Sequence, residues 1–110
     1  MIEAEQLKKM RMEILKDAEN PTKDDNFKSK LEDAKNIALD RIYPYQHEIN
    51  ELPERLQNWQ VRAAIELYNR LGEEGITSYG ENGLSYSYKT DLLSESLMQE
   101  LPPPRAGVLS

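Results

Sequence analysis

The chain has 110 residues, of which 38% are hydrophobic and 31% are charged, and it carries a formal net charge of −6 at pH 7. This length predicts one domain with a modest core, and the acidic balance argues against direct binding of nucleic-acid phosphates, which requires clustered lysine and arginine. The chain has no cysteine, so we expect neither disulfides nor thiolate chemistry. It also has no apolar run of the ~20 residues that a membrane helix needs, and no signal-peptide core at its start. We therefore expect a protein that is made and used in the cytoplasm.

The first 20 residues predict a helix. Its apolar side chains are three and four positions apart and form one narrow stripe, which consists of Leu7, Met10, Ile14 and Ala18. We expect the helix to end at Asn20-Pro21, because proline disfavours helical geometry in the residue before it.

A second helix is expected to begin between Thr22 and Asp25, where capping side chains and acidic residues favour a helix N-terminus. We expect it to end at Tyr43-Pro44-Tyr45. Its predicted buried stripe is Phe27, Leu31, Ala34, Ile37 with Ala38, and Ile42.

A third helix is expected to have Pro53 in its first turn, where the missing N–H costs nothing, and to run to Leu71. Gly72 then provides a left-handed C-terminal residue. The apolar residues of this helix cover more than one face, so we predict that it is the central helix, packed by the first two. These residues are Leu56, Trp59, Val61, Ala63, Ala64, Ile65, Leu67, Tyr68 and Leu71.

After Gly75 the pattern changes to one typical of β-strands. Residues 76–79 and 84–88 are rich in β-forming side chains, and Asn82-Gly83 between them is a strong hairpin-turn signal. We therefore predict a β-hairpin or extended segment near residues 76–88. Because an isolated two-stranded hairpin is marginal in water, it should pack on the helices or on another subunit, or stay mobile until a partner arrives.

The C-terminal residues predict a short helix and a tail. Asp91 and Ser94 are candidate caps for a helix that reaches Leu101, and the three prolines at 102–104 favour an extended, polyproline-like exit. The predicted fold class is therefore mainly α, a small bundle of three main helices around a central one, with the 76–88 segment and a short C-terminal helix. Residues 1–101 would form a single helical domain, and residues 102–110 an extended proline-rich tail.

No motif predicts a catalytic or metal site. His47 is the only histidine, and it lies in a predicted loop without an orienting partner or a nucleophile. The acidic pairs Asp24-Asp25 and Glu73-Glu74 lack the spacing of a calcium loop, and the glycines between 72 and 83 are not followed by the lysine of a phosphate loop. We therefore expect a protein that is not an enzyme and binds no cofactor or metal.

Four motifs, taken in order, resemble the head–tail connector (head-completion) proteins of tailed bacteriophages. They are Asp40-Arg41-Ile42-Tyr43-Pro44-Tyr45, then Ala63-Ala64-Ile65-Glu66-Leu67-Tyr68-Asn69-Arg70, then the glycine- and tyrosine-containing run at 72–83, and finally Pro104-Arg105-Ala106-Gly107-Val108. The resemblance spans residues 7–108 and is most specific over 52–88.

The resemblance implies a structural virion protein. Copies would form a ring, typically dodecameric, that connects the capsid portal to the phage tail and extends the DNA channel after packaging. The implied partners are the portal protein, a tail-side connector or stopper protein and further copies of the chain, while DNA passes through without specific binding and no membrane is involved. The protein would be made in the host cytoplasm and located in the virion, at the head–tail interface.

Two sets of candidate site residues accompany this reading. A partner or inter-subunit interface, formed by strand addition or by docking of an extended arm, would use Ile76, Tyr79, Leu84, Tyr86, Tyr88, Pro103, Pro104 and Arg105. An acidic channel lining would use Glu73, Glu74 and Glu81. Twelve copies with a charge of −6 each would carry about −72, which would repel passing DNA rather than hold it.

The composition also allows two other classes of function. A small acidic adaptor, or an antitoxin-like inhibitor of a basic partner, would bind that partner one to one without forming a ring. A small hydrolase is disfavoured because the chain lacks a nucleophile–base set.

Overall fold

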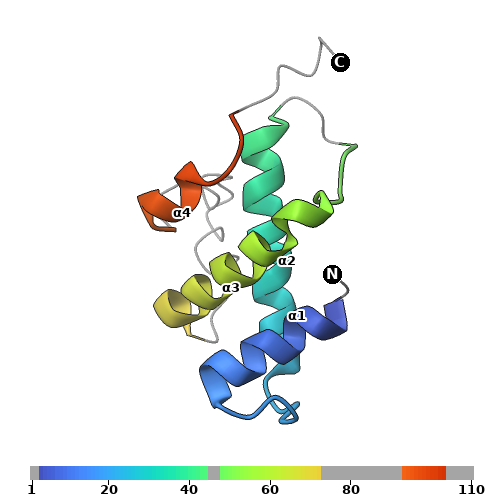
Figure 1. Cartoon of the computed structure of the whole chain (residues 1–110), viewed down its shortest axis with the longest axis vertical. Helices are drawn as coiled ribbons and strands as arrows, with labels where there is room; N and C mark the ends of the chain where they lie inside the picture. Colours follow the sequence, from blue (N-terminus) through green and yellow to red (C-terminus); the bar gives the residue numbers. More distant parts are fainter. Residues whose placement is uncertain (1–2, 45–47, 73–92, 104–110) are drawn as a thin grey trace, which may run out of the picture.

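The computed structural model describes residues 3–44, 48–72 and 93–103, and these form a small helical bundle (Figure 1). The elements in chain order are α1 (Glu3–Met10), a π-helical turn η1 (Arg11–Leu15), α2 (Asp24–Ile42), a 3₁₀ turn η2 (Glu54–Leu56), α3 (Gln57–Leu71) and α4 (Glu95–Gln99). The described residues contain no strand, and they confirm the mainly helical fold class. The β-hairpin predicted near 76–88 lies outside them.

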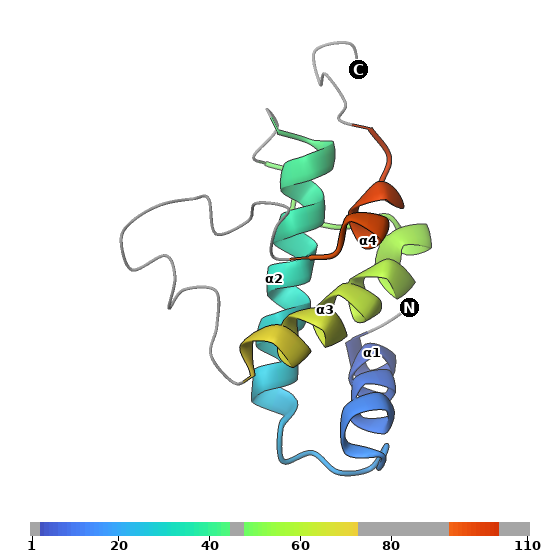
Figure 2. The ribbon, with the colours of Figure 1, turned by 90° about the vertical axis from the view of Figure 1, so that its left-hand side faces the viewer.

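The long helix α2 forms one side of the bundle, and α3 crosses it obliquely in both views (Figures 1 and 2). α3 contacts both α1 and α2, and α4 lies beside it through a contact between Trp59 and Leu97. The core runs through all four helices. These contacts confirm that the third predicted helix is central.

The N-terminal helix ends earlier than the sequence predicted. α1 and η1 together stop at Leu15, because Lys16 adopts a left-handed conformation with φ of 58°. Leu7 and Met10 are buried as expected, whereas Ala18 lies in the following loop, where its carbonyl accepts a hydrogen bond of 3.0 Å from Arg11. The predicted extension of the helix to residue 20 is therefore wrong.

The second helix agrees closely with its sequence pattern. α2 begins at Asp24 and ends at Ile42, directly before the predicted Tyr43-Pro44-Tyr45 stop. All six residues of its predicted stripe are buried, and Phe27 stacks edge-to-face on Tyr68 of α3 with ring centroids 5.4 Å apart. This aromatic contact joins the two longest helices of the bundle.

The third helix has the predicted end but a different start. Pro53 precedes η2, so the chain makes a 3₁₀ turn before α3 begins at Gln57. Gly72 has the positive φ that was expected, 63°, but its ψ of −135° lies outside the left-handed helical region. Its N–H donates to the carbonyl of Tyr68 at 2.7 Å, so the last turn of α3 is closed without the predicted left-handed cap.

Two glutamines link three helices inside the bundle. The Nε2 of Gln6 in α1 donates to Oε1 of Gln60 in α3 at 2.9 Å, and the Nε2 of Gln60 donates to the carbonyl of Leu31 in α2 at 2.8 Å. Both glutamines are buried. Because buried amides need partners, this chain of hydrogen bonds fixes the mutual register of the three helices.

Candidate functional site

The short helix α4 is held on α3 by hydrogen bonds along its whole length. Trp59 is 2% exposed, and its indole Nε1 donates to the carbonyl of Leu97 at 2.7 Å. At the N-terminal end of α4, the carboxylate of Glu66 accepts a hydrogen bond from the backbone N–H of Ser94. Of the two predicted caps, Ser94 is the one that caps the helix, because its hydroxyl accepts from the N–H of Leu97, and α4 ends at Gln99, before the predicted Leu101.

A two-pronged ion pair holds the other end of α4. The guanidinium of Arg62 donates to both carboxylate oxygens of Glu100, at 2.9 and 2.6 Å. This hydrogen bonding lowers the pKa of Glu100 and raises the pKa of Arg62. Both side chains are about half exposed, so the pair mainly orients the end of α4 and contributes little stability.

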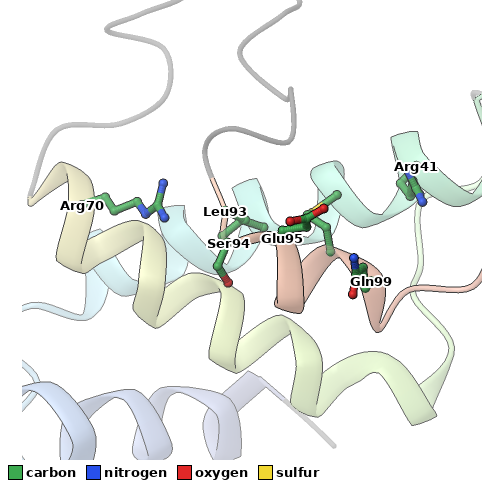
Figure 3. A pocket seen from close by; sticks show the side chains of 7 residues that line it. Arg41, Arg70, Leu93, Ser94, Glu95 and Gln99 are labelled. Carbon is green, nitrogen blue, oxygen red and sulfur yellow. The ribbon is translucent and has the colours of Figure 1, made fainter.

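A hollow of about 560 Å³ lies where α2, α3 and α4 meet (Figure 3). Arg70 of α3 lies at one end and Arg41 of α2 at the other, with Glu95 of α4 and its N-cap Ser94 between them. Arg70 also lies 3.7 Å from Glu66. The lining of this hollow therefore combines two arginines with one glutamate.

A second hollow, here called the α1–α3 groove, has a volume of about 600 Å³ and lies between the C-terminal end of α1, η1 and α3. Its lining combines apolar and charged side chains: Lys9, Met12, Glu13, Asn58, Val61, Arg62 and Ile65. Met12 is 53% exposed, and it is the only large hydrophobic side chain that is exposed within the described ranges. Both hollows are open to the surface.

Most residues of the predicted interface lie outside the described part of the chain. Pro103 is the exception, and it is exposed two residues beyond the buried Leu101. The other interface candidates (Ile76, Tyr79, Leu84, Tyr86, Tyr88, Pro104 and Arg105) and the channel-lining candidates (Glu73, Glu74 and Glu81) fall in residues 73–92 and 104–110, and His47 also lies outside.

Within the described ranges, no three His, Cys, Asp or Glu side chains are grouped as a metal site would require. None of the helices in those ranges is long and apolar enough to cross a membrane. The described surface also carries the two hollows and the anchored helix α4.

The sequence alone did not reveal the contacts that fix α4. Arg62 and Glu100 are 38 positions apart, as are Trp59 and Leu97, and no local pattern pairs them. Trp59 was expected inside an apolar helix, and its burial agrees with that. The crossing of the helices in the bundle brings these residues of α3 and α4 together.

Comparison with known proteins identifies the family. The sequence model described as "Phage gp6-like head-tail connector protein" matches residues 5–101, which includes every described helix from η1 to α4 and most of α1. No curated protein and no solved structure matches the chain. Since the family match covers most of the sequence, the chain belongs to the phage gp6-like head-tail connector proteins, which are structural components of phage assembly.

Proposed function

We propose that copies of this chain form a ring, dodecameric in the virion, that connects the capsid portal to the tail and extends the DNA channel after packaging. The observation that carries the proposal is the family match over residues 5–101. The match favours a connector over the small acidic inhibitor that composition also allowed. In this role the chain acts by binding other proteins and has no enzymatic activity.

The anchoring of α4 supports the proposed use of the two flanking segments. Residues 73–92 join α4 at Leu93, and the tail at 102–110 follows it, and Leu93 and Leu101 are both buried. Trp59 and Arg62 hold α4 to α3, so both segments leave the helical domain (residues 1–101) from fixed points. A segment with a fixed origin loses less entropy when it docks on the portal or on a neighbouring subunit.

The distribution of charge supports an acidic channel lining. Residues 73–92 contain four acidic residues and one lysine, a net charge of −3 within 20 positions. In the proposed ring, Glu73, Glu74 and Glu81 face the lumen and keep DNA from adhering to the wall. Changing all three to lysine should slow DNA ejection, and ejection kinetics equal to those of wild type would rule out this lining.

The proposal is tested by co-sedimentation of the purified chain with the portal ring of the same phage. We expect saturation near one copy per portal subunit, with the bound copies counted by native mass spectrometry. A variant with Glu51→Gln, which changes an exposed residue outside both hollows, serves as the matched control and should bind like wild type. Absence of binding at high protein concentration would overturn the connector role for this chain.

A further inference from the structure

The charged side chains that line the α1–α3 groove differ in how they pair with other described residues. Lys9 donates to Asn58 Oδ1 at 3.0 Å, and Arg62 is paired with Glu100, so both basic groups of the lining are already engaged within the chain. Glu13 is exposed, and in the described ranges it forms neither a hydrogen bond nor an ion pair. Glu13 is therefore the one position of this lining at which a basic side chain of a ligand can form a new ion pair.

The same groove also offers apolar surface. Val61 forms a buried part of the lining, Ile65 is half-buried, and Met12 lies exposed beside them. Methionine adapts its shape to a partner at low cost, and π-helical turns such as the one that carries Met12 are frequent at functional sites. A fitting occupant therefore combines a basic side chain with one or two aliphatic ones.

The tail of the chain has this chemistry. Residues 104–110 contain Arg105 as their only charged side chain, followed by Val108 and Leu109. The prolines at 102–104 favour an extended conformation, which lowers the entropy cost of docking an arm in a groove. The seven residues 104–110, when extended, span at most about 25 Å, which is the reach of the tail beyond Pro103.

The tail of a copy starts at the end of the molecule opposite to its own α1–α3 groove. In both views α1 lies near one end of the bundle, and the described residues after α4 run toward the opposite end (Figures 1 and 2). The tail of a neighbouring copy can reach the groove without turning back along its own helices. Such a contact is heterologous, because the tail of one copy binds the groove of the next, and heterologous contacts generate rings when they close.

We propose that the α1–α3 groove binds residues 104–110 of a second copy of the chain, with Arg105 beside Glu13, and with Val108 and Leu109 against Met12 and Ile65. This inference deepens the proposed function, since it names the contact that builds the ring, and it can be tested without any portal. A portal or tail protein that offers a similar basic and aliphatic segment is the competing occupant.

Disulfide trapping tests the contact cleanly because the chain has no cysteine. A chain with Met12→Cys is mixed with a chain with Val108→Cys, with oxidised glutathione as the oxidant, and the covalent heterodimer is followed on non-reducing gels. The control replaces the first chain by Glu51→Cys, which places the thiol at an exposed position outside the groove. We expect the groove pair to form heterodimers at least about tenfold faster than the control pair, since docking raises the effective concentration of the thiols.

Equal rates for the groove pair and the control pair would overturn the proposal. A chain that carries both Met12→Cys and Val108→Cys should form linked multimers. If it forms only an internal disulfide, the groove binds the tail of its own copy and the inter-subunit assignment is wrong.

Charge reversal tests the pairing of Arg105 with Glu13. Glu13→Arg in the groove chain, or Arg105→Glu in the tail chain, should each slow trapping by about five- to tenfold, as expected for loss and inversion of one exposed ion pair. The combination of a Glu13→Arg groove with an Arg105→Glu tail should restore the rate. Slowing without restoration would refute this pairing.

The trapping and portal-binding experiments separate the two proposals. If trapping succeeds and portal binding fails, the groove contact is kept and the connector role is rejected. If portal binding succeeds and trapping fails, the connector role is kept and the groove contact is rejected.

Discussion

The indole nitrogen of Trp59 in α3 lies 2.7 Å from the carbonyl oxygen of Leu97 in α4, and both residues are buried. The five-residue helix α4 is too short to be stable alone, so its position depends on contacts of this kind. Its fixed position in turn determines where residues 73–92 end and where the tail begins. The contact therefore connects the core of the helical domain to both segments proposed to bind partners.

Replacing Trp59 by phenylalanine should lower the free energy of unfolding by about 1–3 kcal/mol, because it leaves the buried carbonyl of Leu97 without the indole donor and opens some space. The lower half of this range is expected, since the same carbonyl also accepts from the N–H of Glu100 at 3.2 Å. Urea unfolding followed by circular dichroism measures the change. An unaltered midpoint would show that α4 is held by its apolar contacts and not by this hydrogen bond.

The helical part of the fold could be predicted from sequence where apolar spacing and helix-breaking residues agree. The stripe from Phe27 to Ile42 and the stop at Tyr43-Pro44 specify α2 locally, and the broad apolar pattern identifies α3 as central. These features depend on residues within a few positions of each other. Local information of this kind is present in a single sequence.

Other features depend on partners far along the chain. The end of the first helix at Leu15 accompanies an ion pair between Arg11 and Asp24, and the Gln6–Gln60 contact spans 54 positions, so neither leaves a local pattern. The candidate site shows the same limit. The residues selected from sequence lie mostly outside the described ranges, whereas the two hollows arise from the crossing of helices.

Gly72 should resist substitution for a backbone reason alone. A Cβ at this position would have no heavy atom within 4 Å, so alanine would meet no steric obstacle, but the φ of 63° is unfavourable for any L-residue. We expect Gly72→Ala to cost about 1–2 kcal/mol of unfolding free energy. Gly72→Asn provides the matched comparison. Asparagine tolerates the left-handed helical region, but the ψ of −135° lies outside it, so Asn should be no better than Ala. Recovery of stability with Asn would contradict the described backbone.

The Arg11–Asp24 pair should make stability fall in acid. Arg11 hydrogen-bonds to Asp24 and holds the pKa of this carboxyl below its ordinary value of 3.8. A lowered folded-state pKa means that the unfolded chain takes up the proton first, so the stabilisation is complete above the ordinary value and is lost as the pH falls below it. Asp24→Asn should therefore cost at most about 1 kcal/mol at pH 7, because solvent screens these partly exposed side chains, and less near pH 3.

Asp25→Asn is the control for this prediction. Asp25 is exposed in the same first turn of α2 and forms no ion pair within the described ranges, so it shares the helix-terminus effect without the Arg11 contact. Urea unfolding of wild type and both variants at the two pH values makes the comparison. If the two asparagine variants lose equal stability, the helix dipole and not Arg11 is responsible.

Removal of residues 104–110 should separate folding from assembly. The described chain ends at Pro103, which is exposed, while the last buried residue is Leu101, so the deletion removes no described core contact. We expect an unchanged thermal midpoint but weaker self-association and lower occupancy on the portal, because the arm that carries Arg105 is gone. A variant in which glycine and serine replace residues 105–110 keeps the length of the tail. Its self-association and portal occupancy should be as low as those of the deletion. If that variant assembles like wild type, the chemistry of the tail is irrelevant and only its length matters. If the deletion lowers the thermal midpoint, the tail belongs to the folded domain, and its loss could not be used as evidence about assembly.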